Sequence, residues 1–561
     1  MGVNEDFDSM LNEIGGCGLY QIRQNLLVGL AIAFSAVSTI GFVFTAARVP
    51  HRCQVEVCGD QGEMSSPFLP EWLHEAVPIE PSGEPALCVI YQNLNISTNS
   101  CSFDQRSEKR CSSWVYKSRE RTIQTEFSLT CPENEWKLAM VGTLHNIGNM
   151  IGLPISGFLS DRYGRKSALV FSLIANSIFG LLKSTANSFE IFLILETVEP
   201  IFGGNIYGIS FILALELVTP KKRVLGCMVI AVAFAFGSAL VGAVAWVLQD
   251  WRTFLWVTNG PALLFISYIW LLPESVRWLL ARGKLGDAKK VVQFAAKLNR
   301  AELGEERMKD WENDQIDRVY TEEAEKDDSL WPALRKVTKS RILLARLAVC
   351  SVCWASANLV FFGMSLNSVS LAGTDNKYLN FILSSVVEAP SYLITWLCMN
   401  RLGRRKAQLL TFVASGITCF AITFLPKNGK IIRLILYLVG KFAITCAFDT
   451  ALVFTAEIFP TNLRNSLLGL CSMMGRVGSV VAPQTPLMAQ YYNISPLTLF
   501  GTVALIAGTL ALFLPESKGL PLPASVKEAE DLSRQRQNQK ASHNNDLEAT
   551  TALNKLALMD N

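Results

Sequence analysis

The chain has 561 residues, of which 50% are hydrophobic and only 18% carry a charged side chain. Its charges gather in short clusters between long apolar runs, which argues against a soluble enzyme of this length. The formal net charge of +3 gives no reason to expect a nucleic-acid partner.

Twelve apolar runs are long enough to cross a bilayer, which takes about 20 residues for roughly 30 Å of hydrocarbon. They cover 24–47, 138–159, 167–186, 189–215, 224–249 and 253–273, then 342–371, 378–400, 407–426, 432–454, 465–489 and 496–515. The first run is too long for a cleaved signal peptide, so we expect it to remain as a membrane helix. The sequence thus predicts an all-α polytopic membrane protein of twelve transmembrane helices.

A large loop at 48–137 interrupts the first half, which spans 24–273. Its six cysteines predict disulfide bonds in an oxidising compartment, with the pairing left open; they are Cys53, Cys58, Cys88, Cys101, Cys111 and Cys131. The sequon at Asn95 is a glycosylation acceptor if this loop is extracellular. The cysteine and histidine spacing does not suggest structural zinc.

The remaining polar segments are 1–23, 274–340 and 516–561. We expect 274–340 to be a cytoplasmic linker with an amphipathic stretch at Leu285–Leu298, followed by a second helical half at 341–515. The polar tail at 516–561 is expected to be largely disordered, with some helical tendency. Basic clusters at 161–166, 221–223 and 401–406 lie in alternate loops. They share one side of the membrane if both termini are cytoplasmic, which places the cysteine-rich loop outside a plasma membrane.

The two halves repeat three motifs at a nearly constant offset. Gly164-Arg165-Lys166 recurs as Gly403-Arg404-Arg405-Lys406, the pair Glu216 and Arg223 recurs as Glu457 and Arg464, and Pro273-Glu274-Ser275 recurs as Pro515-Glu516-Ser517. This repetition indicates a duplicated six-helix unit. Two parallel halves of this kind are suited to alternating access around a cavity near the membrane midplane, which favours a carrier over a channel.

The stretch from Gly157 to Lys166 resembles the loop motif of the major facilitator superfamily. Gly157 is expected to let two helices approach closely, and Asp161 with the neighbouring arginines is expected to hold a cytoplasmic gate. Positive-inside charge alone would explain the basic residues but neither the glycines nor the aspartate. The gating candidates are Gly157, Asp161, Arg162, Gly164, Arg165, Glu216, Arg223, Gly403, Arg404, Glu457 and Arg464.

Within that superfamily the chain resembles solute carrier family 22, the organic cation, carnitine and organic anion transporters. The resemblance covers nearly the whole chain outside the tail. Four features carry it: the long cysteine-bearing loop, its close at Thr125–Cys131 with Trp136, the stretch Pro273–Leu279, and the stretch Glu457–Arg464. It implies a transporter of small organic ions. The chain departs from the family at Val276, where proline is usual. It also departs at Glu196 and Glu199 in the fourth predicted helix, 189–215, where family members often carry an arginine.

Ionisable residues inside membrane helices cost at least about 2.5 kcal/mol near the bilayer centre, so each is a functional candidate. They are Glu196, Glu199, Glu388, Lys441, Asp449 and Arg476, of which Glu196, Glu199 and Lys441 could instead reach the interface. Family members that carry simple cations tend to have aspartate where this chain has Arg476. The resemblance therefore implies a carnitine-like zwitterion or an organic anion as substrate. The alternative is an internal ion pair of Arg476 with Asp449. Lys441 is a further possible, indirect partner of Asp449.

Aromatic side chains could cage a quaternary ammonium beside these charges. The candidates are Trp354, Phe361, Phe362 and Tyr378, together with Tyr392, although packing alone explains most aromatics at helical spacing. Lys183 at the end of its apolar run is expected to reach the interface. His145 is a candidate proton relay or a structural histidine.

Several function classes are disfavoured. The sequence contains no G-x-x-x-x-G-K-[ST] motif for an ATP-driven pump, and its four histidines suggest neither a catalytic set nor metal ligands, so no enzyme, cofactor or metal is expected. The alternatives kept open are a polyspecific organic cation transporter and a cell-surface receptor or scaffold. The expected partners are a small organic ion, the lipid bilayer and a coupling ion, either sodium or a proton.

Overall fold

A computed structural model describes most of the chain. The described residues are 10, 13–15, 18–60, 66–79, 85–93, 101, 103–217, 223–301, 339–371, 376–426, 429–461, 463–492, 494–520, 522–523 and 525–532. The predicted glycosylation acceptor Asn95 and the side chain of Arg223 lie outside this set.

Helices occupy the six predicted ranges of the first half. They are α2 (Leu19–Ile40) with α3 (Phe42–Thr45), α6 (Glu135–Tyr163), α7 (Arg165–Ser184), α8 (Phe189–Gly203) with α9 (Ile206–Glu216), α10 (Arg223–Leu248), and α11 (Trp251–Asn259) continued by a 3-10 helix (Pro261–Ser267) and α12 (Tyr268–Leu271). The predicted run 189–215 is thus divided, because two turn residues separate α8 from α9 just after Pro200. Two short helices follow, α13 (Val276–Ala281) and α14 (Leu285–Asn299), and α14 confirms the predicted amphipathic stretch.

The second half shows the same agreement. Its helices are α17 (Arg341–Leu371), α18 (Lys377–Val386), α19 (Glu388–Leu402), α20 (Arg404–Phe424), α21 (Lys430–Ile458), α22 (Arg464–Val481), α23 (Thr485–Tyr492) and α24 (Pro496–Leu510). Among the described residues, eleven helical spans are long and apolar enough to cross a membrane. The twelfth predicted span is α6. It has 29 residues but is less apolar, because it buries polar residues such as His145, Asn146 and Asn149.

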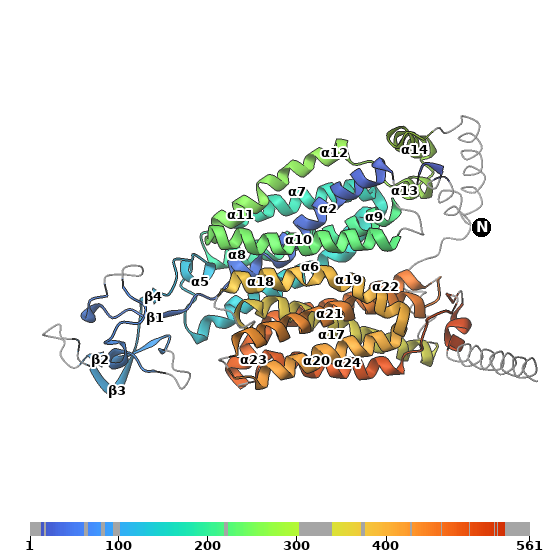
Figure 1. The fold of residues 1–561 in the computed structure, drawn as a ribbon. Coiled ribbons are helices and arrows are strands. Elements are labelled where there is room, and N and C mark those ends of the chain that lie inside the picture. Colours follow the sequence, from blue (N-terminus) through green and yellow to red (C-terminus); the bar gives the residue numbers. More distant parts are fainter. Residues whose placement is uncertain are drawn as a thin grey trace, which may run out of the picture. The chain divides into compact units, whose positions relative to one another are not determined.

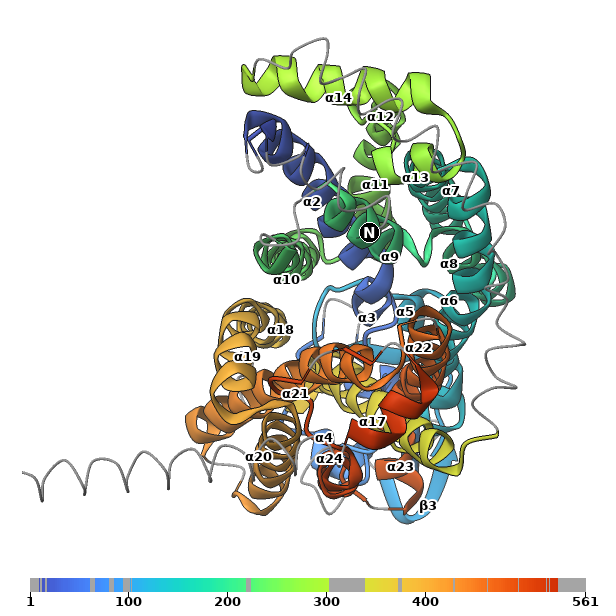
Figure 2. The ribbon, with the colours of Figure 1, turned by 90° about the vertical axis from the view of Figure 1, so that its right-hand side faces the viewer.

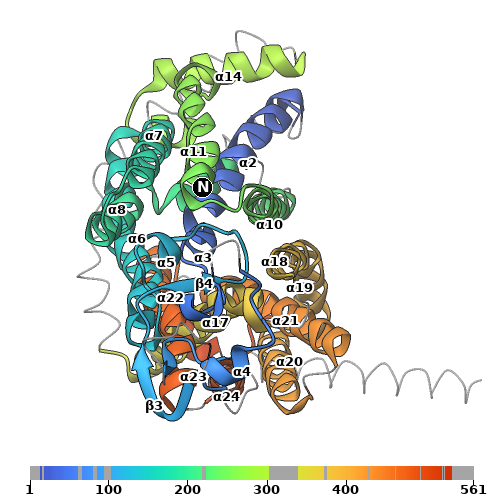
Figure 3. The ribbon, with the colours of Figure 1, turned by 90° about the vertical axis from the view of Figure 1, so that its left-hand side faces the viewer.

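Residues 27–213 and 237–273 form one compact unit. In it α6 and α7 both pack on α8, and α11 packs on α7, an arrangement visible in all three ribbon views (Figures 1, 2 and 3). Close packing of α6 on α8 depends on Gly148 and Gly152. A Cβ atom at Gly148 would lie 2.3 Å from the Thr197 carbonyl oxygen, and one at Gly152 would lie 2.5 Å from that of Ile201. These glycines, rather than Gly157, allow the backbones to approach.

The cysteine-rich segment belongs to the same unit and lies at one end of its helices (Figure 1). Strand β1 (His51–Cys53) pairs antiparallel with β4 (Trp114–Tyr116), and β2 (Val89–Asn93) pairs antiparallel with β3 (Phe103–Arg110). All six cysteines form disulfides, namely Cys53–Cys111, Cys58–Cys101 and Cys88–Cys131. The predicted disulfide bonding is confirmed, and the structure supplies the pairing.

A buried ion pair holds the first part of this segment together. The Arg52 guanidinium contacts the Asp60 carboxylate at 2.8 Å, and both side chains are buried. It also donates to the carbonyl oxygens of Cys53, Pro67 and Phe68 and lies over the Trp72 ring. The ion pair therefore links residues 52–60 to residues 66–72 in a segment that has only a small apolar core.

The second compact unit comprises the chain up to Leu26, Ala214–Phe236 and the residues from Glu274 onward. In it α20 packs between α21 and α24, and α17 packs on α21, α22 and α24; α17, α20, α21 and α24 run side by side in Figure 1. Asn299 at the end of α14 accepts from the Tyr20 backbone N–H and donates to the Ile14 carbonyl. The linker helix is thereby attached to the start of α2.

Part of the predicted disordered tail is ordered. Residues 526–532 are helical, and Ala529 and Leu532 are buried. Arg346 of α17 donates to the carbonyl oxygens of Ala529 and Glu530. The expected helical tendency is observed in this stretch, where Ala529 and Leu532 give the short helix an apolar face to bury.

Candidate functional site

Two predicted binding residues pair with each other inside the second unit. Lys441 of α21 lies 3.0 Å from the Glu388 carboxylate at the start of α19, and both side chains are buried. The Lys441 ammonium also donates to the Ser365 hydroxyl at 2.6 Å and the Phe361 carbonyl at 3.2 Å. An ammonium has three N–H donors, so all three are used within the protein. The Lys441 side chain therefore does not reach the membrane interface, and it does not form an ion pair with Asp449.

Asp449 and Arg476 remain without such partners. In the part of the chain that the structure describes, neither side chain forms an ion pair or a hydrogen bond, and the Asp449 Oδ2 atom is buried. Arg476 is half-buried on α22. The alternative of an internal Arg476–Asp449 ion pair is therefore wrong for this structure. Within the described part of the membrane-spanning helices, two groups of opposite charge therefore lack a charged partner.

Two glycines next to Arg476 allow α22 to pack closely on α17. A Cβ atom at Gly475 would lie 2.6 Å from the Asn358 side chain and 3.3 Å from the Trp354 ring. One at Gly478 would lie 2.1 Å from the Ala355 carbonyl oxygen. Contact with side chains at Gly475 and with the α17 backbone at Gly478 fixes the height and rotation of the turn that carries Arg476.

Gly478→Ala is expected to destabilise the protein, because the new methyl group would overlap backbone atoms of α17. Overpacking of this kind costs about 1–3 kcal/mol, and we expect a lower melting temperature for the purified protein in detergent micelles. Gly469→Ala is the matched control, since a Cβ at Gly469 on the same helix meets no atom within 4 Å. Equal melting temperatures for the two variants would contradict the close packing at Gly478.

Two of the predicted aromatics, Trp354 and Phe361, contact Phe448, and a third, Phe362, contacts Phe361. The Phe448 ring lies 5.8 Å from Trp354 and 5.9 Å from Phe361, and Phe361 lies 5.3 Å from Phe362. The Lys441 ammonium lies 3.3 Å from the Phe361 ring centroid, so an internal cation already occupies that face. Tyr378 lies at the start of α18 with the Lys377 ammonium over its ring. The sequence analysis missed Phe448, although its position beside Asp449 is a usable signal.

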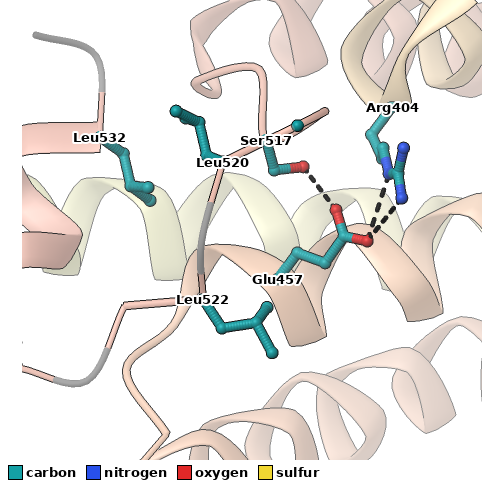
Figure 4. A pocket seen from close by; sticks show the side chains of 7 residues that line it. Arg404, Glu457, Ser517, Leu520, Leu522 and Leu532 are labelled. Atoms are coloured by element: carbon teal, nitrogen blue, oxygen red, sulfur yellow. Dashed lines mark hydrogen bonds and ion pairs between the residues drawn. The ribbon is translucent and has the colours of Figure 1, made fainter. Parts of the chain in front are cut away.

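A charged network joins the gating candidates of the second unit. Arg404 at the start of α20 contacts one oxygen of Glu457 at 2.9 Å, and Ser517 donates to the other at 2.7 Å. Figure 4 shows the two partners on opposite sides of the Glu457 carboxylate. They line a pocket of about 80 Å³ that is completed by Gly519, Leu520, Leu522 and Leu532. The repeated Pro515-Glu516-Ser517 motif thus supplies a partner that the candidate set lacked.

Two glycines make the same sharp turn between helices. Gly403 has φ +90° and Gly164 has φ +108°, a conformation that side chains with a Cβ rarely adopt. A Cβ atom on Gly403 would lie only 2.5 Å from a carboxylate oxygen of Glu516. The same carboxylate accepts hydrogen bonds from the backbone N–H groups of Arg404 and Arg405. This carboxylate satisfies donors at the start of α20.

The gating candidates of the first half are more exposed. Asp161 contacts Arg165 at 2.5 Å, with the Asp161 side chain 73% exposed, and Arg162 is exposed. A Cβ at Gly157 would meet no atom within 4 Å, so the predicted close approach at Gly157 is wrong among the described residues. Glu216 is half-buried at the end of α9, and Arg464 is half-buried at the start of α22. Burial lowers the pKa of Arg464, and the charge of Glu457 opposes this shift.

A buried charge cluster in the first unit joins residues that the sequence analysis considered only one by one. Lys183 contacts both Glu196 and Glu199, so its expected escape to the interface is wrong. His145 contacts Glu196 as well. A lysine within one apolar run and two glutamates within the next are a signal for such a pairing.

The family comparison identifies the class of protein. The family model described as "Sugar (and other) transporter" matches residues 91–525. The fold matches the major facilitator superfamily proton:xylose symporter XylE, with a TM-score of 0.59 and 17% identity over 92% of this chain and 99% of that one. An inward-open structure of XylE from E. coli gives a TM-score of 0.54 at 17% identity, over 91% and 99% of the two chains. The chain is therefore a multi-pass membrane transporter with the major facilitator fold, not an enzyme.

Within that class, the chain belongs to the sugar (and other) transporter family. Curated relatives confirm the resemblance to solute carrier family 22. The Organic cation transporter protein of Drosophila melanogaster is 29% identical over 94% of this chain and 95% of its own length. The human Organic cation/carnitine transporter 2 is 29% identical over 93% of both chains. Solute carrier family 22 member 2 of Homo sapiens is 29% identical over 95% of this chain and 96% of its own.

Proposed function

We propose that the chain carries carnitine-like zwitterions or organic anions across the plasma membrane by alternating access, with both termini cytoplasmic. The main supporting observation is that, among the described residues, the buried Asp449 Oδ2 atom has no hydrogen-bond partner and no charged group or hydrogen bond acts on Arg476, whereas Lys441 and Glu388 pair with each other. A charge left unpaired in a membrane helix is costly, so its retention points to a ligand. A guanidinium binds a carboxylate in two parallel hydrogen bonds, and a carboxylate attracts an ammonium.

The aromatic cluster supports the same substrate class. Phe448 precedes Asp449 in the chain and packs on Trp354 and Phe361. Aromatic faces beside a carboxylate favour a quaternary ammonium, which has no N–H donors and binds through its charge and methyl groups. In this proposal Trp354 and Phe362 line the site, while Glu388 and Lys441 position α19 and α21 without touching substrate.

The networks at the helix ends are proposed to gate the cavity. Arg404, Glu457 and Ser517 stabilise one arrangement of the second half, and Asp161 with Arg165 does so in the first. Charge-assisted bonds that form in one state and break in the other give two discrete conformations. The disulfide-bonded segment suits an oxidising exterior, and Asn95 is its proposed glycosylation site.

A polyspecific organic cation transporter is the second candidate. The buried, unpartnered carboxylate of Asp449 favours it, as do relatives whose names describe organic cation transporters. The two candidates differ in their use of Arg476, since a fixed positive charge near the site repels a simple cation and attracts an anionic group.

Uptake by cells expressing wild type, Arg476→Asp or Arg476→Lys tests the proposal. The probes are radiolabelled carnitine, tetraethylammonium and a dicarboxylate. We expect wild type to take up carnitine or the dicarboxylate. In Arg476→Asp this uptake should fall by about tenfold or more, because a charged hydrogen bond is lost and the charge is reversed. Arg476→Lys should retain part of it. Arg341→Asp, at an exposed arginine of α17, is the control for charge reversal. Preferred uptake of tetraethylammonium, unchanged in Arg476→Asp, would support the cation carrier instead.

A further inference from the structure

Four ionisable side chains meet inside the helices of the first unit. The Lys183 ammonium of α7 lies 2.7 Å from Glu196 of α8 and also contacts Glu199, one helical turn further along α8. The His145 Nδ1 atom of α6 lies 2.9 Å from the other oxygen of Glu196. All four side chains are at most 6% exposed. The cluster therefore has to balance its charge almost entirely from its own members.

The members of the cluster do not balance when every group has its ordinary charge. Two ionised carboxylates and one ammonium leave a net charge of −1 if His145 is neutral. Burying an uncompensated ion costs several kcal/mol even after the surroundings relax, and such a site normally takes up a proton instead. One additional proton makes the cluster neutral.

The surrounding elements supply no further compensating charge. The adjoining helix α3 contributes the Phe42 ring, 5.2 Å from His145, and neither the 3-10 helix at 261–267 nor α12, which also pack on α7, has a charged residue. Arg252 of α11 donates to the Ser184 and Ala186 carbonyl oxygens beside Lys183. Its charge is paired with Glu126 at 2.6 Å, so it leaves the charge of the cluster unchanged.

The polar contacts indicate which group holds the proton. Glu196 has a hydrogen bond with His145 and an ion-pair contact with Lys183, whereas Glu199 has only Lys183 as a partner among the described residues. The His145 Nε2 atom is buried and has no hydrogen-bond partner, so a doubly protonated imidazole would bury an unpaired N–H. Glu199 is therefore the least stabilised anion and the group for which protonation costs least.

The same geometry disfavours a sodium ion at this position. The Lys183 ammonium already lies between the two carboxylates, where a metal cation would have to bind. In the part of the chain that the structure describes, no group of His, Cys, Asp and Glu side chains is arranged to hold a metal ion. The free ligand that fits the cluster is a proton.

We propose that Glu199 is a proton-binding site, positioned by Lys183, Glu196 and His145, whose exchangeable proton couples the first half of the protein to pH. Its coupling to transport rests on the proposed function. In the binding step a proton from water forms an O–H bond with the Glu199 carboxylate. In the release step that bond breaks, the electron pair stays on the carboxylate, and the cluster becomes −1.

Infrared titration of the full-length protein in detergent micelles tests this site without any substrate. We expect wild type to show the C=O stretch of a buried, protonated carboxyl group that disappears reversibly within about pH 5–9, the span over which buried glutamates titrate. Glu199→Gln should remove this band, since the amide keeps the shape but binds no proton. Glu190→Gln is the matched control, because Glu190 is an exposed glutamate of the same helix.

Lys183→Met provides a second variant that leaves both glutamates in place. Without the ammonium both carboxyl groups should be protonated, and the band should roughly double. Size-exclusion profiles establish that each variant is folded. A wild-type band identical to that of Glu199→Gln, a band removed only by Glu196→Gln, or a band that does not titrate would each overturn the proposal. Because no transported probe is involved, failure here is distinguishable from failure of the proposed substrate class.

Discussion

Lys441→Met is expected to destabilise the protein by about 3–5 kcal/mol, the usual cost of leaving one partner of a buried ion pair uncompensated. The Glu388 carboxylate would lose its contact at 3.0 Å. Ser365 and the Phe361 carbonyl would lose their shared donor. The expected result is a strongly lowered melting temperature of the purified protein, with poor recovery of folded material.

The double variant Lys441→Met with Glu388→Met separates structure from substrate contact. Replacing both partners with apolar side chains is often nearly neutral, so most of the lost stability should return. Lys430→Met, at an exposed lysine on the same helix, is the matched control and should resemble wild type. If the single variant melts like wild type, the pair does not hold α19 to α21. If the double variant is stable but takes up no substrate, Glu388 or Lys441 contacts the substrate directly.

Arg52→Met is expected to disrupt the cysteine-rich segment to a similar degree. The substitution would bury the Asp60 carboxylate without its partner and free the carbonyl oxygens of Cys53, Pro67 and Phe68. Loss of one member of such a pair costs about 3–5 kcal/mol. We expect rapid cleavage of this segment by protease on intact cells, along with reduced surface expression. Arg106→Met, at an exposed arginine of β3, is the control; equal cleavage of both variants would contradict this role of Arg52.

The same pair gives the segment a defined dependence on pH. Burial alone would raise the pKa of Asp60, but hydrogen bonds from Arg52 and the Val55 backbone, together with the Arg52 charge, lower it below its ordinary value. A lowered carboxyl pKa stabilises the folded state above the unfolded pKa of about 3.9. This contribution is lost as the pH falls through the folded pKa. In Arg52→Met the effect of burial is opposed mainly by the remaining hydrogen bonds, so the pKa of Asp60 should rise. Lowering the pH should then cost the variant less stability than it costs wild type.

The helices could be predicted well because their signal is local. Each membrane span needs its own continuous apolar run, and each predicted range contains a helix. The one span with a weak signal, α6, is also the one that buries His145, Asn146 and Asn149. The break after Pro200 and the position of the helix at 526–532 were not predicted, because each depends on what the chain packs against.

The site was predicted less well because partnership between charges is a tertiary property. The sequence indicated that Glu388, Lys441, Asp449 and Arg476 lie within the membrane helices. It did not indicate that Lys441 would form an ion pair with Glu388, more than 50 positions earlier, rather than with Asp449 on its own helix. Likewise the repeated Pro515-Glu516-Ser517 motif marked a constrained region, but its role as a partner of Glu457 required the fold.

Ligand-induced thermal stabilisation of the purified protein tests the central claim most directly, since a ligand that binds the folded state raises the melting temperature, and more so when it binds more tightly. The ligands are carnitine, choline as its cationic part and 3-hydroxybutyrate as its anionic part. We predict that carnitine stabilises wild type. Arg476→Gln should lose the responses to carnitine and 3-hydroxybutyrate and keep the response to choline. Asp449→Asn should lose the response to choline and keep the response to 3-hydroxybutyrate. Each loss should correspond to about 10–100-fold in affinity. Wild-type responses to carnitine in both variants would contradict the assignment of these two charges to the substrate.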